Sequence, residues 1–296
     1  MAPATNAIDI NRNTTGVVLP KELSDEIWAN AIEDSVIMRV APRIDLPGNG
    51  VVVPLITGDA TAEWVGETNE KAVSHATLSS KSIQAHKIAV IELFSMEFRR
   101  DLERVYEELV RRLPMSIGKK FDETVFGTVA PGSNFDTLGN STAVSLTPGS
   151  GDTVYTQLVT AYSTVGTAGY ELTRWVMAPQ AMGTLLGAVD GNKRPLLIDS
   201  ANTDGAVGSI LGAAVEKSRH AYKAGTPATL GFAGDWSQAR WGMVNPGITV
   251  SISDQATIND GNNQINLWQR NMFAVRVEAE LGFVVKDAAA FVKITA

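Results

Sequence analysis

Apolar side chains recur every three or four positions in parts of this 296-residue chain and at alternate positions in others. The helical spacing predicts a short amphipathic helix within residues 20–40 and the longest helix of the chain over residues 97–128. Pro114 lies inside the longer helix, and we expect it to kink or divide that helix because proline lacks the backbone donor. The first sixteen residues are polar and aperiodic, which indicates an extended arm or a disordered tail.

The remaining patterns predict strands mixed with shorter helices. Residues 51–56 (VVVPLI) read as a strand, whereas residues 131–153 are rich in Gly, Pro, Ser and Thr and predict a long loop or a boundary between lobes. The chain closes with two alternating runs that predict long half-buried strands, so the expected fold class is α+β, with an α/β lobe after the loop. Between the loop and these runs, candidate helices cover 156–165 and 179–189, and candidate strands cover 174–178, 212–218, 229–236, 240–244 and 248–253.

Composition narrows the class of protein. With 44% apolar and 19% charged residues, the chain can bury the core of one large domain or of two lobes. It has no cysteine, which excludes disulfides, thiolate metal sites and cysteine nucleophiles. A formal charge of -7 argues against a dedicated DNA binder, although an acidic protein can line a space that contains DNA. There is no signal-like start and no apolar run of membrane-spanning length, so we expect a soluble intracellular protein without membrane contact.

Motifs of catalysis are mostly missing. His75, His86 and His220 are scattered, without the spacing of a helical zinc pair, and are interpreted as surface or packing residues, so no metal or cofactor is expected. Neither a phosphate-binding P-loop nor a G-x-S-x-G elbow occurs. Trp236 and Trp241 lie five residues apart and could stack on a sugar or a base, yet tryptophans in strands are more often core or interface anchors.

Several phrases, read in order, resemble the major capsid proteins of tailed double-stranded-DNA bacteriophages, the Hong Kong 97 fold. The stretch from Trp64-Val65-Gly66-Glu67 through a Ser/Thr-rich crest to SKSIQAHKIAVIELFSMEFRRD is similar to the extended ribbon loop of that family, followed by its spine helix. The resemblance extends from about residue 17 to the C-terminus. Its other phrases are WVMAPQAMGTLLGAVDGNKRPLL, LGAAVEKS, FAGDWSQARWGMVNPGITVSIS and LWQRNMFAVRVEAELGFVVKDAAAFVKIT.

The resemblance implies a particular division of the chain. It places an N-terminal arm and short helix in 1–50, an extended β-ribbon loop in 51–96 and a peripheral lobe with the spine helix in 97–150. An axial α/β lobe would follow in 151–260, and C-terminal strands would return to the peripheral lobe in 261–296. A long two-stranded ribbon is poorly stable alone, so it is expected to lie on a neighbouring subunit.

The implied function is structural and not enzymatic. The chain would assemble into pentamers and hexamers of a closed icosahedral shell that encloses double-stranded DNA without reading its sequence. The shell would form in the cytoplasm of the host bacterium, become part of the virion, and have portal and decoration proteins as partners. Because the arm helix follows Met1 within about twenty residues, we also expect a separate scaffolding protein. Residues expected to contact neighbouring subunits are Trp64, Glu67, Lys71, His75, Lys81, Arg99 and Arg100.

Some members of that family lock the shell with an isopeptide bond between a ribbon lysine and a neighbour's asparagine, with a glutamate as base. The resemblance makes Lys71 the candidate nucleophile and Asn271 and Glu278 its candidate partners. The chemistry needs a neutral amine, so burial would have to lower the pKa of the lysine while the glutamate takes the proton. The structural alternative is a lysine in a salt bridge, an asparagine at a strand end and a glutamate on a solvent-facing strand.

Three other hypotheses remain open from the sequence. The first is an encapsulin-type nanocompartment, which has the same fold and packages a protein instead of a genome. The second is a soluble carbohydrate-active or other enzyme that uses Asp235, Trp236 and Trp241. The third is a tail or decoration protein, although the long helix over 97–128 argues against those mostly β architectures.

Overall fold

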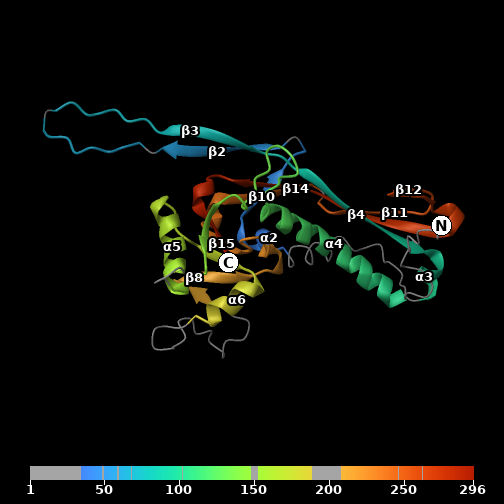
Figure 1. The fold of residues 1–296 in the computed structure, drawn as a ribbon. Coiled ribbons are helices and arrows are strands. Elements are labelled where there is room, and N and C mark those ends of the chain that lie inside the picture. Colours follow the sequence, from blue (N-terminus) through green and yellow to red (C-terminus); the bar gives the residue numbers. More distant parts are fainter. Residues whose placement is uncertain are drawn as a thin grey trace.

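A computed structural model describes residues 35–48, 50–58, 60–67, 69–101, 103–147, 153–188, 208–245, 247–261 and 263–296. Within these residues the chain forms a mixed α+β body from which a two-stranded ribbon projects to one side (Figure 1). The mixture of helices and strands confirms the predicted fold class. The amphipathic helix expected within 20–40 lies outside the described residues except for its last part, α2 (Val36–Val40), which is helical.

The ribbon consists of β2 (Val51–Gly58) and β3 (Thr77–Ile83), which pair antiparallel and belong to no other sheet. Their register runs from Val51 opposite Ile83 at the root to Gly58 opposite Thr77 near the far end. Residues 60–76, which we call the crest, close the ribbon at its end (Figure 1). The ribbon therefore keeps its crest well away from the body.

A five-stranded sheet forms the part of the body next to the ribbon. Its central strand, β14 (Met272–Val285), alternates between side chains in the main core and side chains on the opposite face. β4 runs along one edge of β14, and β11 runs along the other, because both pair with residues 274–278. β10 also pairs with β14, and β1 pairs with β10. Besides β14, the sheet therefore contains β1 (Arg43–Leu46), β4 (His86–Ser95), β10 (Ala239–Val244) and β11 (Thr249–Ser253).

Two helices follow β4, and the second packs against β4 and β14. α3 (Met96–Asp101) precedes α4 (Glu103–Val125), the longest helix among the described residues. α4 continues through Pro114, so the predicted division at that residue is wrong, while a kink there stays a prediction. Lys119 and Glu123 form an i, i+4 ion pair of 3.8 Å on its exposed side.

A six-stranded sheet forms the second part of the body, with α5 (Val154–Thr167) and α6 (Pro179–Leu186) beside it (Figure 1). α5 begins with a capping box between Thr153 and Thr156 and buries Leu158, Ala161 and Val165. In spatial order the strands are β5 (Thr142–Ser145), β15 (Phe291–Thr295), β9 (Thr229–Gly234), β6 (Arg174–Met177), β8 (Ala213–Lys217) and β7 (Ser209–Ile210).

Short elements complete the described chain. β12 (Thr257–Asp260) and β13 (Asn263–Asn266) form a hairpin. Its Ile258 and Ile265 belong to a small apolar cluster that also contains Met272 and Ala274. Four single-turn 3₁₀ helices connect the larger elements: η1 (Arg219–Ala221), η2 (Trp236–Gln238), η3 (Trp268–Arg270) and η4 (Ala288–Ala290).

The loop predicted over 131–153 is only partly a loop. It contains β5, which pairs in parallel with β15, and Phe135 and Leu138, which are buried in the main core. A strand of four residues is hard to recognise when its pairing partner lies about 150 positions away in the sequence. The described part of this segment thus contributes to the six-stranded sheet and to the main core.

Each of the two sheets combines strands from several of the residue ranges into which the resemblance divides the chain. β4 falls in the range of the ribbon loop, 51–96, yet it pairs with β14 in the five-stranded sheet. β10 and β11 fall in 151–260 and lie in the same sheet. β15 falls in 261–296 and lies in the six-stranded sheet with β5 and β9. The chain therefore passes between the two sheets several times.

Candidate subunit-interaction site

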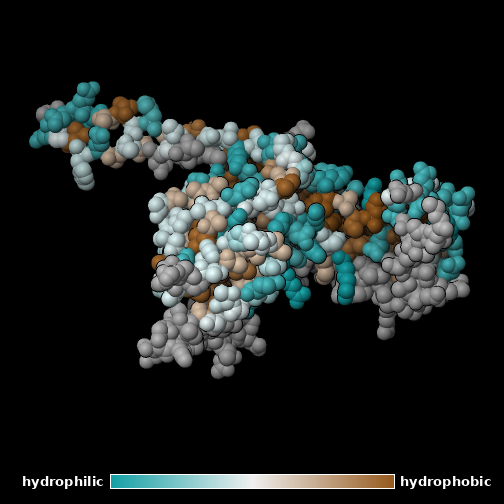
Figure 2. All heavy atoms as spheres, viewed as in Figure 1, coloured by the Kyte–Doolittle hydropathy of each residue, from teal (hydrophilic) through white to brown (hydrophobic). Residues whose placement is uncertain are grey.

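The crest presents apolar side chains that have no partner in the described part of the chain. Trp64 is fully exposed, and Val73 is 80% exposed. Ser74 is half-buried, and its hydroxyl accepts a hydrogen bond from the Thr61 backbone N–H at 2.7 Å. The other described crest residues are exposed. Figure 2 shows apolar and polar residues side by side at this end of the ribbon. An exposed tryptophan on a projecting segment is typical of a contact surface.

Of the seven residues expected at subunit contacts, four lie together on the crest. Trp64, Glu67, Lys71 and His75 are all exposed there. The crest therefore offers one large aromatic ring among charged and polar groups, which is the composition of an interface anchor with a polar rim. The sequence identified this cluster because its residues are local to one segment.

Lys81 lies elsewhere, at the ribbon root. Its Nζ atom is 2.6 Å from Asp136 Oδ2 and donates a hydrogen bond of 2.7 Å to the Val285 carbonyl. The ammonium group is therefore held by its own chain. No sequence signal connects Lys81 with Asp136 or Val285, since these residues are 55 and 204 positions away.

The two arginines expected at subunit contacts lie in α3, which directly follows the C-terminal end of β4. The Arg99 guanidinium stands over the ring of Phe273, with its carbon 5.5 Å from the ring centroid, in the geometry of a cation–π contact. Arg100 follows it in the helix, and its side chain lies outside the described residues.

The proposed crosslinking residues do not meet within one chain. Asn271 is exposed at the start of β14 and donates from its amide to Glu97 Oε1 at 3.2 Å. Glu278 lies seven residues further along the strand, 3.4 Å from Arg276 Nε and 4.0 Å from Lys87 Nζ. At about 3.3 Å per residue, Asn271 and Glu278 are separated by roughly 23 Å. Lys71 is on the crest, and the carboxylate next to Asn271 in the same chain is Glu97.

The tryptophan pair is not a binding platform. Trp236 and Trp241 are each only 2% exposed. Their indole N–H groups donate to the carbonyls of Arg174 and Ala41, at 3.2 and 3.0 Å, and Asp235 accepts from the Ser237 backbone. The carbohydrate-platform hypothesis is therefore wrong, because both rings are core residues whose polar atoms are already satisfied.

Two of the histidines pack inside the structure. His86 is 2.9 Å from the Ser133 carbonyl through Nε2 and contacts the edge of Phe135. His220 lies with Nδ1 3.3 Å from Asp122 Oδ2, so a carboxylate orients its ring. Asp122 is 98 positions away in the sequence, so only the tertiary structure brings the two together.

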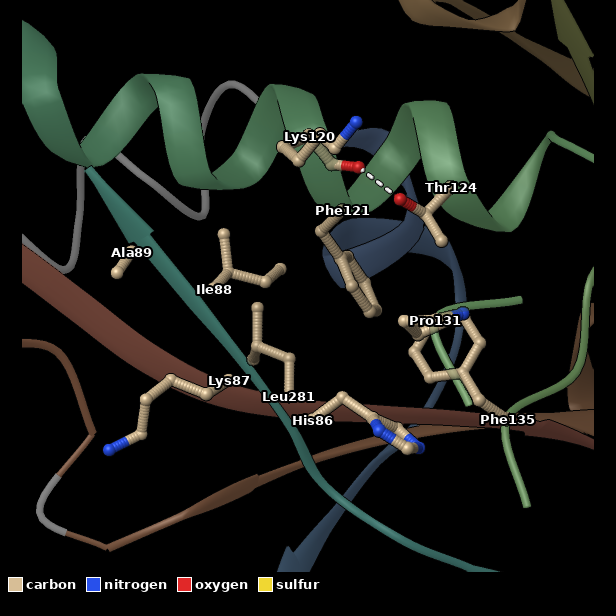
Figure 3. Close-up of a pocket in the computed structure, with 10 residues that line it drawn as sticks. All are labelled: His86, Lys87, Ile88, Ala89, Lys120, Phe121, Thr124, Pro131, Phe135 and Leu281. Atoms are coloured by element: carbon tan, nitrogen blue, oxygen red, sulfur yellow. Dashed lines mark hydrogen bonds between the residues drawn. The ribbon is translucent and has the colours of Figure 1, made fainter. Parts of the chain in front are cut away.

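A cavity of about 290 Å³ opens between α4, β4 and the segment after α4 (Figure 3). Phe121, Phe135 and Leu281 supply apolar walls, and Lys87 points away from the centre. The described residues that line this cavity include no carboxylate, and the Thr124 hydroxyl donates to the Lys120 carbonyl at 2.7 Å. The lining therefore offers no carboxylate that could act as a general acid or base.

The described residues hold neither a metal cluster nor a membrane-spanning helix. No group of three or more histidine and acidic side chains there could hold a metal ion. No helix in the described part of the chain is long and apolar enough to cross a membrane. Among the described residues, the projecting ribbon is the feature that suits contact with another molecule.

Comparison with known proteins agrees with a structural role. The profile of the phage capsid family matches residues 15–296, and the chain belongs to this family. It is 33% identical over 290 residues to the probable major capsid protein gp17 of Mycobacterium phage D29, covering 94% of this chain and 89% of the relative. The corresponding protein of Mycobacterium phage L5 is 34% identical over 295 residues, with the same coverage.

Solved structures show the same fold. A chain from Gordonia phage Cozz superimposes with a TM-score of 0.72 at 25% identity, covering 94% of this chain and 91% of that one. A chain described as the capsid of a native GTA particle, computed with C5 symmetry, gives a TM-score of 0.68 at 14% identity, covering 99% and 97%. The protein is therefore a major capsid protein of a tailed phage and a component of the virion.

Proposed function

We propose that this protein builds a closed icosahedral shell from pentamers and hexamers, and that the shell encloses double-stranded DNA. The observation that carries the proposal is that the ribbon holds its crest far from the body (Figure 1). The crest includes the exposed Trp64. An isolated two-stranded ribbon is marginally stable in water, so a second copy of the chain supplies the missing contacts. The family membership and the capsid particles among the structural relatives support this assignment.

The arrangement of the sheets supports a Hong Kong 97-like subunit. In this proposal the five-stranded sheet with α4 is the peripheral lobe, α4 is the spine helix, and the six-stranded sheet with α5 and α6 is the axial lobe. The ribbon β2–β3 is the extended loop that lies on a neighbouring subunit. A closed shell requires one chain to make repeated and slightly different contacts, which suits a ribbon with few attachments to its own body.

The setting of assembly follows from the same proposal. The shell forms in the cytoplasm of the host bacterium, directed by a separate scaffolding protein and completed by a portal and decoration proteins. The formal charge of -7 supports a container that avoids tight, nonspecific binding of the genome.

Removal of the crest tests the shell proposal. In the test variant an Asn-Gly turn replaces residues 59–76, so that β2 and β3 close as a two-residue hairpin. We expect the wild-type chain, co-expressed with its scaffold gene, to form closed shells or capsomers in negative-stain microscopy. The variant should keep the wild-type unfolding midpoint and form neither.

A matched control changes an exposed apolar residue that is outside the ribbon. Val129 is 79% exposed, and Val129→Ser should leave assembly unchanged. Full-sized shells from the crest-deleted chain would show that the ribbon is dispensable. A wild-type chain that stays monomeric under all conditions, with the scaffold present, would overturn the shell assignment itself.

A covalent lock between Lys71 and Asn271 is a separate part of the proposal. Because Asn271 and Glu278 lie roughly 23 Å apart on one strand, one lysine could reach both only if different copies supplied them. The bond would join Lys71 Nζ to the Asn271 side-chain carbonyl carbon and release ammonia, with Glu278 taking the proton. A boiled denaturing gel of purified particles decides this, since a single band at 31.6 kDa would eliminate the crosslink.

A further inference from the structure

The ribbon begins where β4 leaves the five-stranded sheet. β4 pairs with β14 only as far as His86 opposite Leu281, whereas β14 continues to Val285. The last four residues of β14 therefore have no β4 residue opposite them. An open strand edge with unpaired backbone groups is unfavourable when it is buried, so other groups must satisfy it.

Two residues, Asp136 and Lys81, close this open edge. The Asp136 backbone N–H donates to the Phe283 carbonyl at 3.0 Å, and the Val285 N–H donates to Asp136 Oδ2 at 2.8 Å. The Val285 carbonyl accepts from Lys81 Nζ at 2.7 Å. Lys81 and Asp136 are themselves joined by an ion pair of 2.6 Å. One residue of the ribbon and one residue of the loop after α4 thus replace a missing strand.

The backbone of the ribbon root is held equally closely. The Gln84 N–H donates to the Asn134 carbonyl at 3.1 Å. A Cβ atom on Gly282 would lie 2.8 Å from the Gln84 carbonyl oxygen, which shows how near the root crosses β14. Ile83 is 1% exposed in a cluster with Leu46 and Val284. The root is therefore attached on both its polar and its apolar side.

We infer that Lys81 and Asp136 are positioning residues, whose contact sets the direction in which the ribbon leaves the body. This inference rests on the proposed function, because direction matters only if the crest must meet a second copy. From Ile83 to the crest at Glu67 an extended chain covers roughly 50 Å, so a rotation of about 10° at the root displaces the crest by about 9 Å. A displacement of that size would move Trp64 out of any specific contact.

The chemistry of the pair explains why both residues are needed. The Lys81 ammonium has three donors and no acceptor, so it can bond the Val285 carbonyl and the Asp136 carboxylate together. The carboxylate, in turn, accepts from both Lys81 and the Val285 N–H. Loss of the ammonium leaves a carboxylate next to an unpaired carbonyl, which favours opening of the root.

The direction of the ribbon can be measured because the chain has no cysteine. Ala72→Cys on the crest and Ala288→Cys in η4 introduce two exposed attachment points for spin labels. Pulsed electron spin resonance then measures the distance between crest and body. Mixing labelled with excess unlabelled chain restricts the signal to distances within one subunit.

Four versions of the labelled protein make the test specific. Lys81→Met should broaden the distance distribution and shift its mean, and it should reduce the yield of shells. Lys81→Arg keeps a cationic donor and should restore both. Asp136→Asn keeps an acceptor for Val285 but loses the charge, so it should have an intermediate effect. The matched control is Lys87→Met, which removes a β4 lysine whose ion pair with Glu280 is 3.3 Å.

The outcomes separate the two proposals. A Lys81→Met protein with the wild-type distance distribution would overturn the positioning role, whatever happens to assembly. A lower unfolding midpoint with an unchanged distribution would show that the pair only stabilises the fold, and would also overturn it. If the wild-type chain formed no shells but Lys81→Met still released the ribbon, the shell assignment would fail while the root contact stood.

Discussion

The carboxylate of Asp122, in α4, contacts two segments that are distant in sequence, the start of α2 and η1. Its carboxylate accepts from the Ser35 hydroxyl at 2.6 Å and from the Val36 N–H at 2.9 Å, where α2 begins. The same carboxylate lies 3.3 Å from His220 Nδ1, in η1. Asp122 is fully buried, so these groups replace the water it has lost. One side chain of α4 thus joins the start of α2 to the second part of the body.

Removing the Asp122 carboxylate should be strongly destabilising. Asp122→Ala leaves the buried Ser35 and Val36 donors without their acceptor, and we expect a loss of about 3–5 kcal/mol in the free energy of unfolding. Denaturant unfolding measures this loss. Asp122→Asn keeps one acceptor oxygen and should lose less. The control is Asp45→Ala, at an exposed acid that pairs with Arg43, which should leave the midpoint unchanged.

Tyr170 provides a prediction at alkaline pH. Its hydroxyl donates to Asp287 Oδ2 at 2.7 Å, and this hydrogen bond, helped by burial and by nearby negative charge, raises the pKa of Tyr170 to about 12. The folded state therefore keeps a proton that the unfolded state loses near pH 10. The contribution of this contact to stability should be complete below pH 10 and disappear as the pH rises toward 12.

Ultraviolet titration of the isolated subunit measures the tyrosine step directly. The wild-type protein should show one tyrosine that ionises later than an ordinary tyrosine, and Tyr170→Phe should remove that step. Asp287→Asn should move it to lower pH, because the acceptor has lost its charge. A late step that persists in Tyr170→Phe would assign it to another residue.

At the scale of elements, aromatic contacts fasten α4 to the five-stranded sheet. Phe121 of α4 is fully buried, and its ring meets the rings of Phe135 and Phe283 edge-on at centroid distances of 6.3 and 6.4 Å. Phe135 comes from the segment after α4 and Phe283 from β14. This three-ring cluster lies beneath the ribbon root, since the neighbouring Asp136 holds Phe283 and Val285.

Phe121→Ala should leave a cavity that the surrounding rings cannot fill. We expect a loss of about 3–5 kcal/mol in the free energy of unfolding, measured by denaturant titration. Phe121→Leu retains most of the buried volume and should cost less. An alanine variant as stable as the wild type would mean that α4 is not held through this cluster.

At the scale of the whole molecule, the long axis runs from the crest at one end to α3 and the β12–β13 hairpin at the other (Figure 1). A single copy thus exposes contact surfaces at widely separated points. Such a shape suits an extended sheet of subunits better than a compact monomer, and the family membership agrees with it.

The overall charge leads to a prediction about DNA. With 25 basic and 32 acidic residues, the isolated subunit should bind double-stranded DNA more weakly than nonspecific binders do, with a dissociation constant above about 10⁻⁴ M at physiological salt. Fluorescence anisotropy with a labelled duplex measures this affinity. Saturable binding in the micromolar range that weakens steeply with salt would reveal a concentrated basic surface and contradict the prediction.

The local patterns of the chain predicted more than half of its described elements. The alternation over 271–285 became β14, and the spacing over 156–165 became the centre of α5, because periodicity records which side chains face the core. The cluster of interface candidates on the crest was also predictable, since its members are neighbours in sequence. Pro114 does not divide α4, because packing against the sheet overrides a local penalty.

The sequence by itself determined many of the helices and strands and the absence of the usual catalytic motifs, and its resemblance to the capsid family indicated a ribbon with a polar crest. Only the tertiary structure decided that Trp236 and Trp241 are core residues, that His220 meets Asp122, and that Lys81 closes the edge of β14. The physical reason is distance along the chain. Periodicity determines which way a side chain faces, whereas its partner, here 98 or 204 positions away for His220 and Lys81, depends on how the sheets assemble.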